Sequence, residues 1–121
     1  MRRLIIVVFI FISSFTTNIF AEVKIGIILG FTGPIETLTP AMAASAEIAF
    51  KEASDSGSLL GGEKISVVRA DSTCVDSAVA TAVAEGVVAQ GVVAIMGADC
   101  PGVTSAIAVS YTHLTLPTIL L

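Results

Sequence analysis

Residues 23–50, "VKIGIILGFTGPIETLTPAMAASAEIAF", decide the fold of this chain. The segment Val23–Leu29 is almost continuously apolar, which is typical of a β-strand covered on both faces. A glycine-containing loop follows it. Thr39 is then expected to cap a helix over residues 41–54, with Pro40 at the first helical position, where a missing N–H costs nothing. A strand, a loop and a helix in this order often form part of a binding site in α/β proteins.

The same pattern recurs twice further along the chain. The apolar, β-branched runs Ile65–Ala70 and Val92–Met96 predict two more strands. A second helix is expected over Ser77–Gln90, and a third is expected to begin near Pro101 or Gly102. The order β-α-β-α-β-α predicts an α/β fold of the Rossmann-like, doubly wound type, with a parallel sheet and right-handed crossovers.

Residues 1–21 have the layout of a secretory signal peptide. Two arginines are followed by the apolar stretch Leu4–Ile12 and then by small and polar residues up to Ala21. The apolar stretch is much shorter than the ~20 residues that span a bilayer. We therefore expect export to the periplasm. The chain is also acidic, with a formal net charge of −4 at pH 7 and no tryptophan, which is a poor match for nucleic acid.

The cysteine pattern predicts no metal site and no cofactor. Cys74 and Cys100 are not part of a C-x-x-C pair, and His113 is the only histidine, so a zinc site lacks ligands. In an exported chain the two cysteines either form a disulfide or remain two buried, unlinked side chains.

The C-terminal stretch 110–121, "SYTHLTLPTILL", fits the predicted plan badly. Threonine recurs at alternate positions, a lone proline interrupts the stretch, and no helix is expected to continue the face of Ala106–Val109. We interpret these residues as translated sequencing-adapter sequence. The alternative is a fourth strand around Leu116–Leu121.

A ligand is expected in the crevice at the carboxyl ends of the strands. If the strand order begins 2-1-3, the crevice lies between the loops 30–39 and 97–102. No G-x-G-x-x-G, G-K-[ST] or G-x-S-x-G motif is present, so a dinucleotide site, a phosphate loop and a nucleophile elbow are not predicted. Asp71 and Asp99 follow strands, where aspartate usually serves in turns rather than in acid–base chemistry.

What remains is a site that holds a small solute. Helix N-termini could bind an anion such as a carboxylate, and hydroxyl and apolar side chains could surround the rest of the solute. Each hydroxyl could equally be a helix cap, and each apolar residue could be ordinary packing. The hydroxyl candidates are Thr32, Thr37, Thr39 and Thr104, and the apolar candidates are Phe31, Ile35 and Leu38.

Four segments carry a resemblance to a known family. These are "VKIGIILGFTGP", "AEIAF", "KISVVRADSTC" and "AQGVVAIMGADC". In order and spacing they resemble the start of the periplasmic solute-binding proteins of ABC importers for branched-chain amino acids, the leucine-binding or type I family. The resemblance covers about residues 23–109, so residues 22–109 are identified as part of the first lobe of a truncated type I binding fold.

The resemblance implies a receptor and not an enzyme. It implies a disulfide between Cys74 and Cys100, two lobes that close on a small amino acid or a related solute, and delivery of that solute to an ABC permease in the inner membrane. A ligand-sensing domain of a signalling receptor with the same fold is the alternative. The expected ligand-binding residues are Thr32, Gly33, Leu38, Gly102, Val103 and Thr104.

Two positions depart from the family pattern. Pro101 stands where family members commonly carry a hydroxyl residue, so only the backbone of Gly102 and Val103 and the hydroxyl of Thr104 remain for the solute head group. Leu38 stands where branched-chain binders often place a tyrosine. The solute could therefore differ from a branched-chain amino acid, and a first lobe alone is expected not to bind it tightly.

Overall fold

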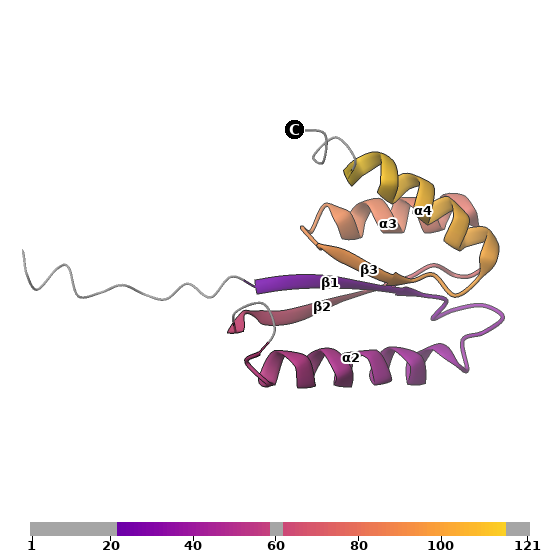
Figure 1. The fold of residues 1–121 in the computed structure, drawn as a ribbon. Coiled ribbons are helices and arrows are strands. Elements are labelled where there is room, and N and C mark those ends of the chain that lie inside the picture. The colour runs from indigo at the N-terminus through magenta and orange to yellow at the C-terminus, as the bar shows by residue number, and fades with distance from the viewer. Residues whose placement is uncertain (1–21, 59–61, 116–121) are drawn as a thin grey trace, which may run out of the picture.

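A computed structural model describes residues 22–58 and 62–115 of the 121-residue chain. Three parallel strands form one sheet in the order β2-β1-β3, with α2 on one face and α3 and α4 on the other (Figure 1). The predicted α/β class, the parallel sheet and the strand order are confirmed. The elements are β1 (Glu22–Leu29), α2 (Thr39–Asp55), β2 (Lys64–Asp71), α3 (Ser77–Val88), β3 (Ala94–Gly97) and α4 (Pro101–Thr115).

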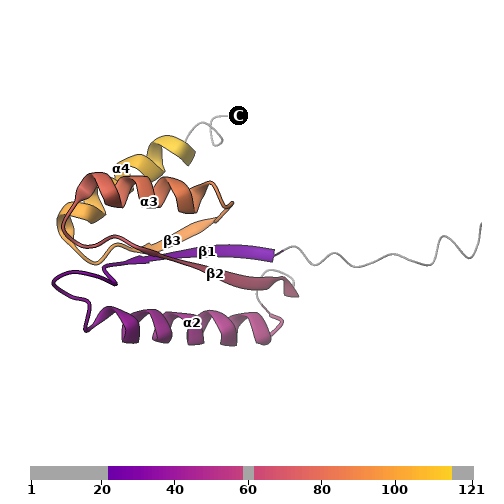
Figure 2. The ribbon, with the colours of Figure 1, turned by 180° about the vertical axis from the view of Figure 1, so that it is seen from behind.

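The register brings the carboxyl ends of all three strands to one edge of the sheet. Leu29 at the end of β1 pairs with Asp71 at the end of β2, and Ile28 pairs with Gly97 at the end of β3. The three loops that follow the strands therefore lie together at one end of the molecule, as both ribbon views show (Figures 1 and 2).

The core has two layers because the side chains of β1 alternate between the faces of the sheet. Ile27 and Leu29 pack with Ala43 of α2 on one face. Ile28 packs on the other face with residues of α3 and α4, including Val103 and Ile107. All three strands were expected to be buried on both faces of the sheet, but only β1 has fully buried residues on both faces. β2 and β3 flank β1; β2 is mostly half-buried, and in β3 the two central residues are half-buried while Ala94 and Gly97 are exposed.

The start of α2 differs from the prediction. The helix begins at Thr39, and the cap position is Leu38, which makes no side-chain capping bond. Thr39 is completely buried, and its hydroxyl donates to the Gly30 carbonyl at 3.0 Å. A turn closed by the hydrogen bond from the Leu38 N–H to the Ile35 carbonyl precedes the helix. The helix therefore begins one residue before the predicted first position, Pro40, and the Thr39 hydroxyl points into the core. At α3 the start agrees with the prediction, because the Asp76 carboxylate accepts from the first-turn N–H groups.

The C-terminal helix is longer than the sequence predicted. No helix was expected beyond Val109, but α4 continues to Thr115. Val103, Ile107 and Tyr111 recur at four-residue spacing, and the Tyr111 hydroxyl donates to the Val93 carbonyl at 3.2 Å, so the inward face of the helix persists. That residues 110–121 are adapter sequence stays a prediction.

Other predictions fall on residues outside the described ranges. These are the signal peptide over residues 1–21 and the alternative strand at 116–121. Among the described residues, no helix has the length and apolar character needed to cross a membrane.

Candidate functional site

The three loops at the carboxyl ends of the strands are tied to one another. The Gly30 N–H, directly after β1, donates at 2.9 Å to the carboxylate of Asp99, the second residue after β3. A disulfide joins Cys74, in the loop after β2, to Cys100 at the start of α4, with the two Cα atoms 5.5 Å apart. The alternative of two unlinked cysteines is therefore wrong. The Gly30–Asp99 bond joins the two predicted walls of the crevice, and the disulfide joins the loop after β2 to the second wall.

Asp71 anchors the first loop to the end of β2. Its carboxylate accepts from the Thr32 hydroxyl at 2.6 Å, from the Thr32 N–H at 3.3 Å and from the Thr73 N–H at 2.8 Å. Burial raises the pKa of Asp71, but the Thr32 hydroxyl and the backbone N–H groups of Thr73, Thr32 and Phe31 outweigh it and hold the pKa below its usual value. Asp71 thus has the turn-forming role that the sequence predicted, and it also positions the loop.

Gly33 allows the first loop to lie against the loop after β2. Its φ of +96° is in the left-handed region, and a Cβ placed on it would lie 2.4 Å from the Thr73 carbonyl oxygen. A side chain at this position would force the two loops apart. Gly33 therefore sets how closely the loop after β1 packs against the loop after β2, and its contact with a solute stays a prediction.

The start of α4 presents unpaired N–H groups. The first helical hydrogen bond runs from the Thr104 N–H to the Cys100 carbonyl at 2.9 Å. The N–H groups of Gly102 and Val103 precede it and have no partner within the helix, and Pro101 has no N–H. Val103 as a whole residue is only 2 % exposed and its side chain belongs to the core, so the N–H of the exposed Gly102 is the more accessible donor of the two.

The Thr104 hydroxyl already has partners of its own. It lies 2.7 Å from the Cys100 carbonyl and 3.0 Å from the Ala98 carbonyl. Because a carbonyl only accepts, the hydroxyl hydrogen is directed at one of these two oxygens. The Thr32 hydroxyl is committed to Asp71 in the same way. Both threonines are left with oxygen lone pairs that can accept a hydrogen bond.

The remaining predicted residues differ in where the structure places them. Leu38 is 61 % exposed, and Thr37 is exposed as well. Phe31 and Ile35 are half-buried, and Phe31 packs against the α2 side of the core. Thr39 is buried and bonded to Gly30, so its hydroxyl does not face a solute and that candidate was wrong.

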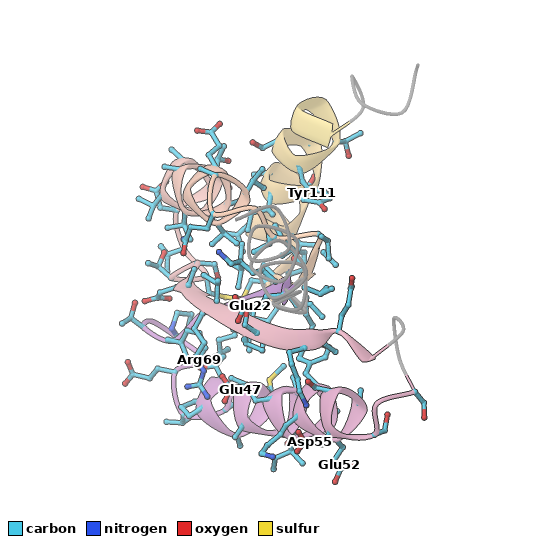
Figure 3. The ribbon with its side chains drawn as sticks, turned by 90° about the vertical axis from the view of Figure 1, so that its left-hand side faces the viewer. Glu22, Glu47, Glu52, Asp55, Arg69 and Tyr111 are labelled. Carbon is cyan, nitrogen blue, oxygen red and sulfur yellow. A yellow bond between two sulfur atoms is a disulfide. The ribbon has the colours of Figure 1, made fainter. Side chains whose placement is uncertain are left out.

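Sequence reasoning missed an ion pair that supports the first loop. Arg69 of β2 donates to the Glu47 carboxylate of α2 through Nη2, at 2.6 Å, and through Nε (Figure 3). Its guanidinium also lies over the Phe31 ring, 5.8 Å from the centroid. The hydrogen bonds from Arg69 lower the pKa of Glu47. Glu47 lies within the "AEIAF" motif, but nothing in the sequence pointed to its partner.

Known proteins match this arrangement of strands and loops. The sequence profile of the family described as periplasmic binding protein matches residues 22–119. The chain belongs to the periplasmic binding protein family. A search of curated protein sequences finds no match.

A solved structure resembles this periplasmic binding protein chain. It is the branched-chain amino acid transporter substrate binding protein LivJ from Streptococcus pneumoniae, in complex with isoleucine. The two are 28 % identical with a TM-score of 0.68, over 77 % of this chain and 26 % of LivJ. The chain thus spans about a quarter of the length of that protein. The family and LivJ are binding proteins and not enzymes, in agreement with the prediction from the sequence.

Proposed function

We propose that this chain is the first-lobe part of an exported solute-binding receptor of an ABC importer. The receptor binds a small amino acid or a related solute between two lobes and delivers it to a permease in the inner membrane. The observation that supports the proposal is the end of the sheet where the loops after β1, β2 and β3 are cross-linked to one another beside the N-terminus of α4. The similarity to isoleucine-bound LivJ supports the same class of solute.

The polarity of these groups suits a zwitterion. The N–H groups of Gly102 and Val103, at the positive end of α4, are matched to a carboxylate. The lone pairs of Thr32 and Thr104 are matched to an ammonium group, because the hydrogens of both hydroxyls are directed elsewhere. Leu38 is exposed on the first loop and offers an apolar contact for a side chain.

The location of the receptor follows from the same proposal. Residues 1–21 act as the signal peptide, which exports the protein to the periplasm. Residues 22–109 form part of the lobe that carries the crevice. Solute-driven closure of a second lobe onto this crevice would let a permease distinguish loaded receptor from empty receptor. The alternative function is a ligand-sensing domain of a signalling receptor with the same fold, for which the downstream gene sequence is decisive.

The proposal is tested by an NMR titration of the ¹⁵N-labelled chain, because this method detects weak binding to one lobe. Isoleucine is added up to millimolar concentration, and isoleucine amide, which lacks the carboxylate, serves as the matched control. We expect isoleucine to shift the amide signals of Gly102 and Val103 and the amide to leave them unchanged. Equal shifts with both compounds, or shifts confined to residues far from the crevice, would contradict the proposal.

A further inference from the structure

Three potential metal ligands lie together beneath the crevice. One ligand atom each from Cys74, Asp99 and Cys100 falls within 4.8 Å of the other two. All three residues are half-buried, and they come from the loops that follow β2 and β3. In the described structure the two cysteines form a disulfide, whose sulfur atoms are not thiolate ligands.

The Asp99 carboxylate has one oxygen without a partner. Its Oδ2 accepts from the Gly30 N–H at 2.9 Å, whereas its Oδ1 is buried and has no hydrogen-bond donor. A buried carboxylate oxygen without a partner is costly. A cation held by the same cluster would satisfy it without disturbing the bond to Gly30.

We propose that the dithiol form of this chain binds a thiophilic divalent cation of the Zn²⁺ type through Cys74, Cys100 and Asp99. A dithiol or phosphine reductant supplies two electrons, the S–S bond breaks, and each sulfur takes one proton while the reductant is oxidised. The cation then displaces the two thiol protons and forms two metal–sulfur bonds and one metal–oxygen bond. Water completes a four-coordinate site.

The positions of the two cysteines suit a shared cation. Cys74 lies in the loop after β2, and Cys100 directly precedes α4. The Cα separation of 5.5 Å is short enough for two cysteine sulfurs to share one ion at the usual zinc–sulfur distance of about 2.3 Å. Thiolates, a carboxylate oxygen and a tetrahedral geometry together select zinc over magnesium or calcium.

The bound cation would replace the disulfide as the link between the two loops. In the oxidised chain the Cys74–Cys100 bond holds the loop after β2 against the start of α4. In the reduced chain a Cys–metal–Cys bridge would join the same positions, and Asp99 would add a third point of attachment. The crevice could therefore keep its shape in either redox state.

Cobalt titration tests the site, because Co²⁺ occupies zinc sites and thiolate ligation produces a strong near-ultraviolet charge-transfer absorption. The whole chain is reduced with a phosphine, the reductant is removed under anaerobic conditions, and the protein is titrated with Co²⁺. We expect an absorption that saturates at one Co²⁺ per chain and disappears when Zn²⁺ is added. The oxidised chain should show none.

The variant Asp99→Asn separates this site from two cysteines that bind metal by themselves. Loss of one ligand should weaken Co²⁺ binding about tenfold or more, since even an outer-shell partner contributes that much. Asp55→Asn is the matched control and should bind like the wild type, because Asp55 is exposed at the C-terminal end of α2, where it pairs with Lys51. An unfolded dithiol would bind independently of Asp99. Equal affinity of Asp99→Asn and wild type, or no thiolate–cobalt absorption in the reduced wild type, would overturn the proposal.

Discussion

Replacing Gly33 with alanine should destabilise the chain far more than the added methyl group suggests. The new Cβ would lie 2.4 Å from the Thr73 carbonyl oxygen, well inside van der Waals contact. That oxygen cannot easily retreat. The Ser72 N–H donates to the Leu29 carbonyl at 2.9 Å, the Thr73 N–H donates to Asp71, and the disulfide holds Cys74.

The expected loss combines two costs. A left-handed conformation costs a non-glycine residue about 1–2 kcal/mol, and forcing an extra carbon into a filled space typically costs about 1–3 kcal/mol. Gly33→Ala should therefore lower the free energy of unfolding by about 3 kcal/mol. With a urea m-value of about 1.5 kcal/mol per molar, the unfolding midpoint should fall by about 2 M.

Gly102→Ala is the matched control, since a Cβ at Gly102 would meet no atom within 4 Å. This glycine lies in the first turn of α4, where alanine should stabilise the chain by about 0.5–1 kcal/mol. Urea unfolding followed by circular dichroism measures both variants. A Gly33→Ala midpoint within error of the wild type, or equal to that of Gly102→Ala, would refute the reasoning about the loop contact.

Three more predictions concern the disulfide, the Asp71 carboxylate and the packing of Val103. Replacing both Cys74 and Cys100 with serine should lower the free energy of unfolding by about 3.5 kcal/mol in the entropic model, given the sequence separation of 26 residues. Urea unfolding measures this loss, and an unchanged unfolding midpoint would count against the model. The depressed pKa of Asp71 should contribute stability that is present above about pH 4 and lost as the pH falls through the folded-state pKa. The stability difference between wild type and Asp71→Asn should therefore shrink from pH 6 to pH 3, and a constant difference would exclude this role. Val103→Ala should cost about 2 kcal/mol because the side chain is 2 % exposed, and a thermal melt that does not shift would show that the residue is not packed as described.

The sequence carried enough information to predict the layered fold because its local signals agree with one another. The apolar run of β1 is buried on both faces, Asp76 caps α3, and the alternation of strands and helices leaves a parallel sheet as the simple solution. Thr39 was misassigned because a threonine before a proline has the same local pattern whether its hydroxyl caps the helix or turns inward. Only the fold of the first loop, with Gly30 next to Thr39, decides between the two.

The loops that carry the candidate site were predicted in outline, but their contacts with one another were not. The positions of Gly102 and Thr104 follow from the start of a helix after the third strand. Their hydrogen-bond partners depend on long-range pairings such as Gly30 with Asp99 and Glu47 with Arg69. These pairings join segments far apart in the chain, and one sequence contains no signal for them. The extension of α4 past Val109 was missed because the threonines in this stretch concealed the spacing of Ile107 and Tyr111.

The central claim is that this chain is part of the first lobe of a solute-binding receptor. The most direct test is to sequence the source locus with long reads across the codons from Val109 onward. The account predicts that the reading frame continues into a second α/β lobe and then stops. A frame that ends directly after Leu121, or that continues into a membrane-spanning helix and a signalling domain, would contradict it.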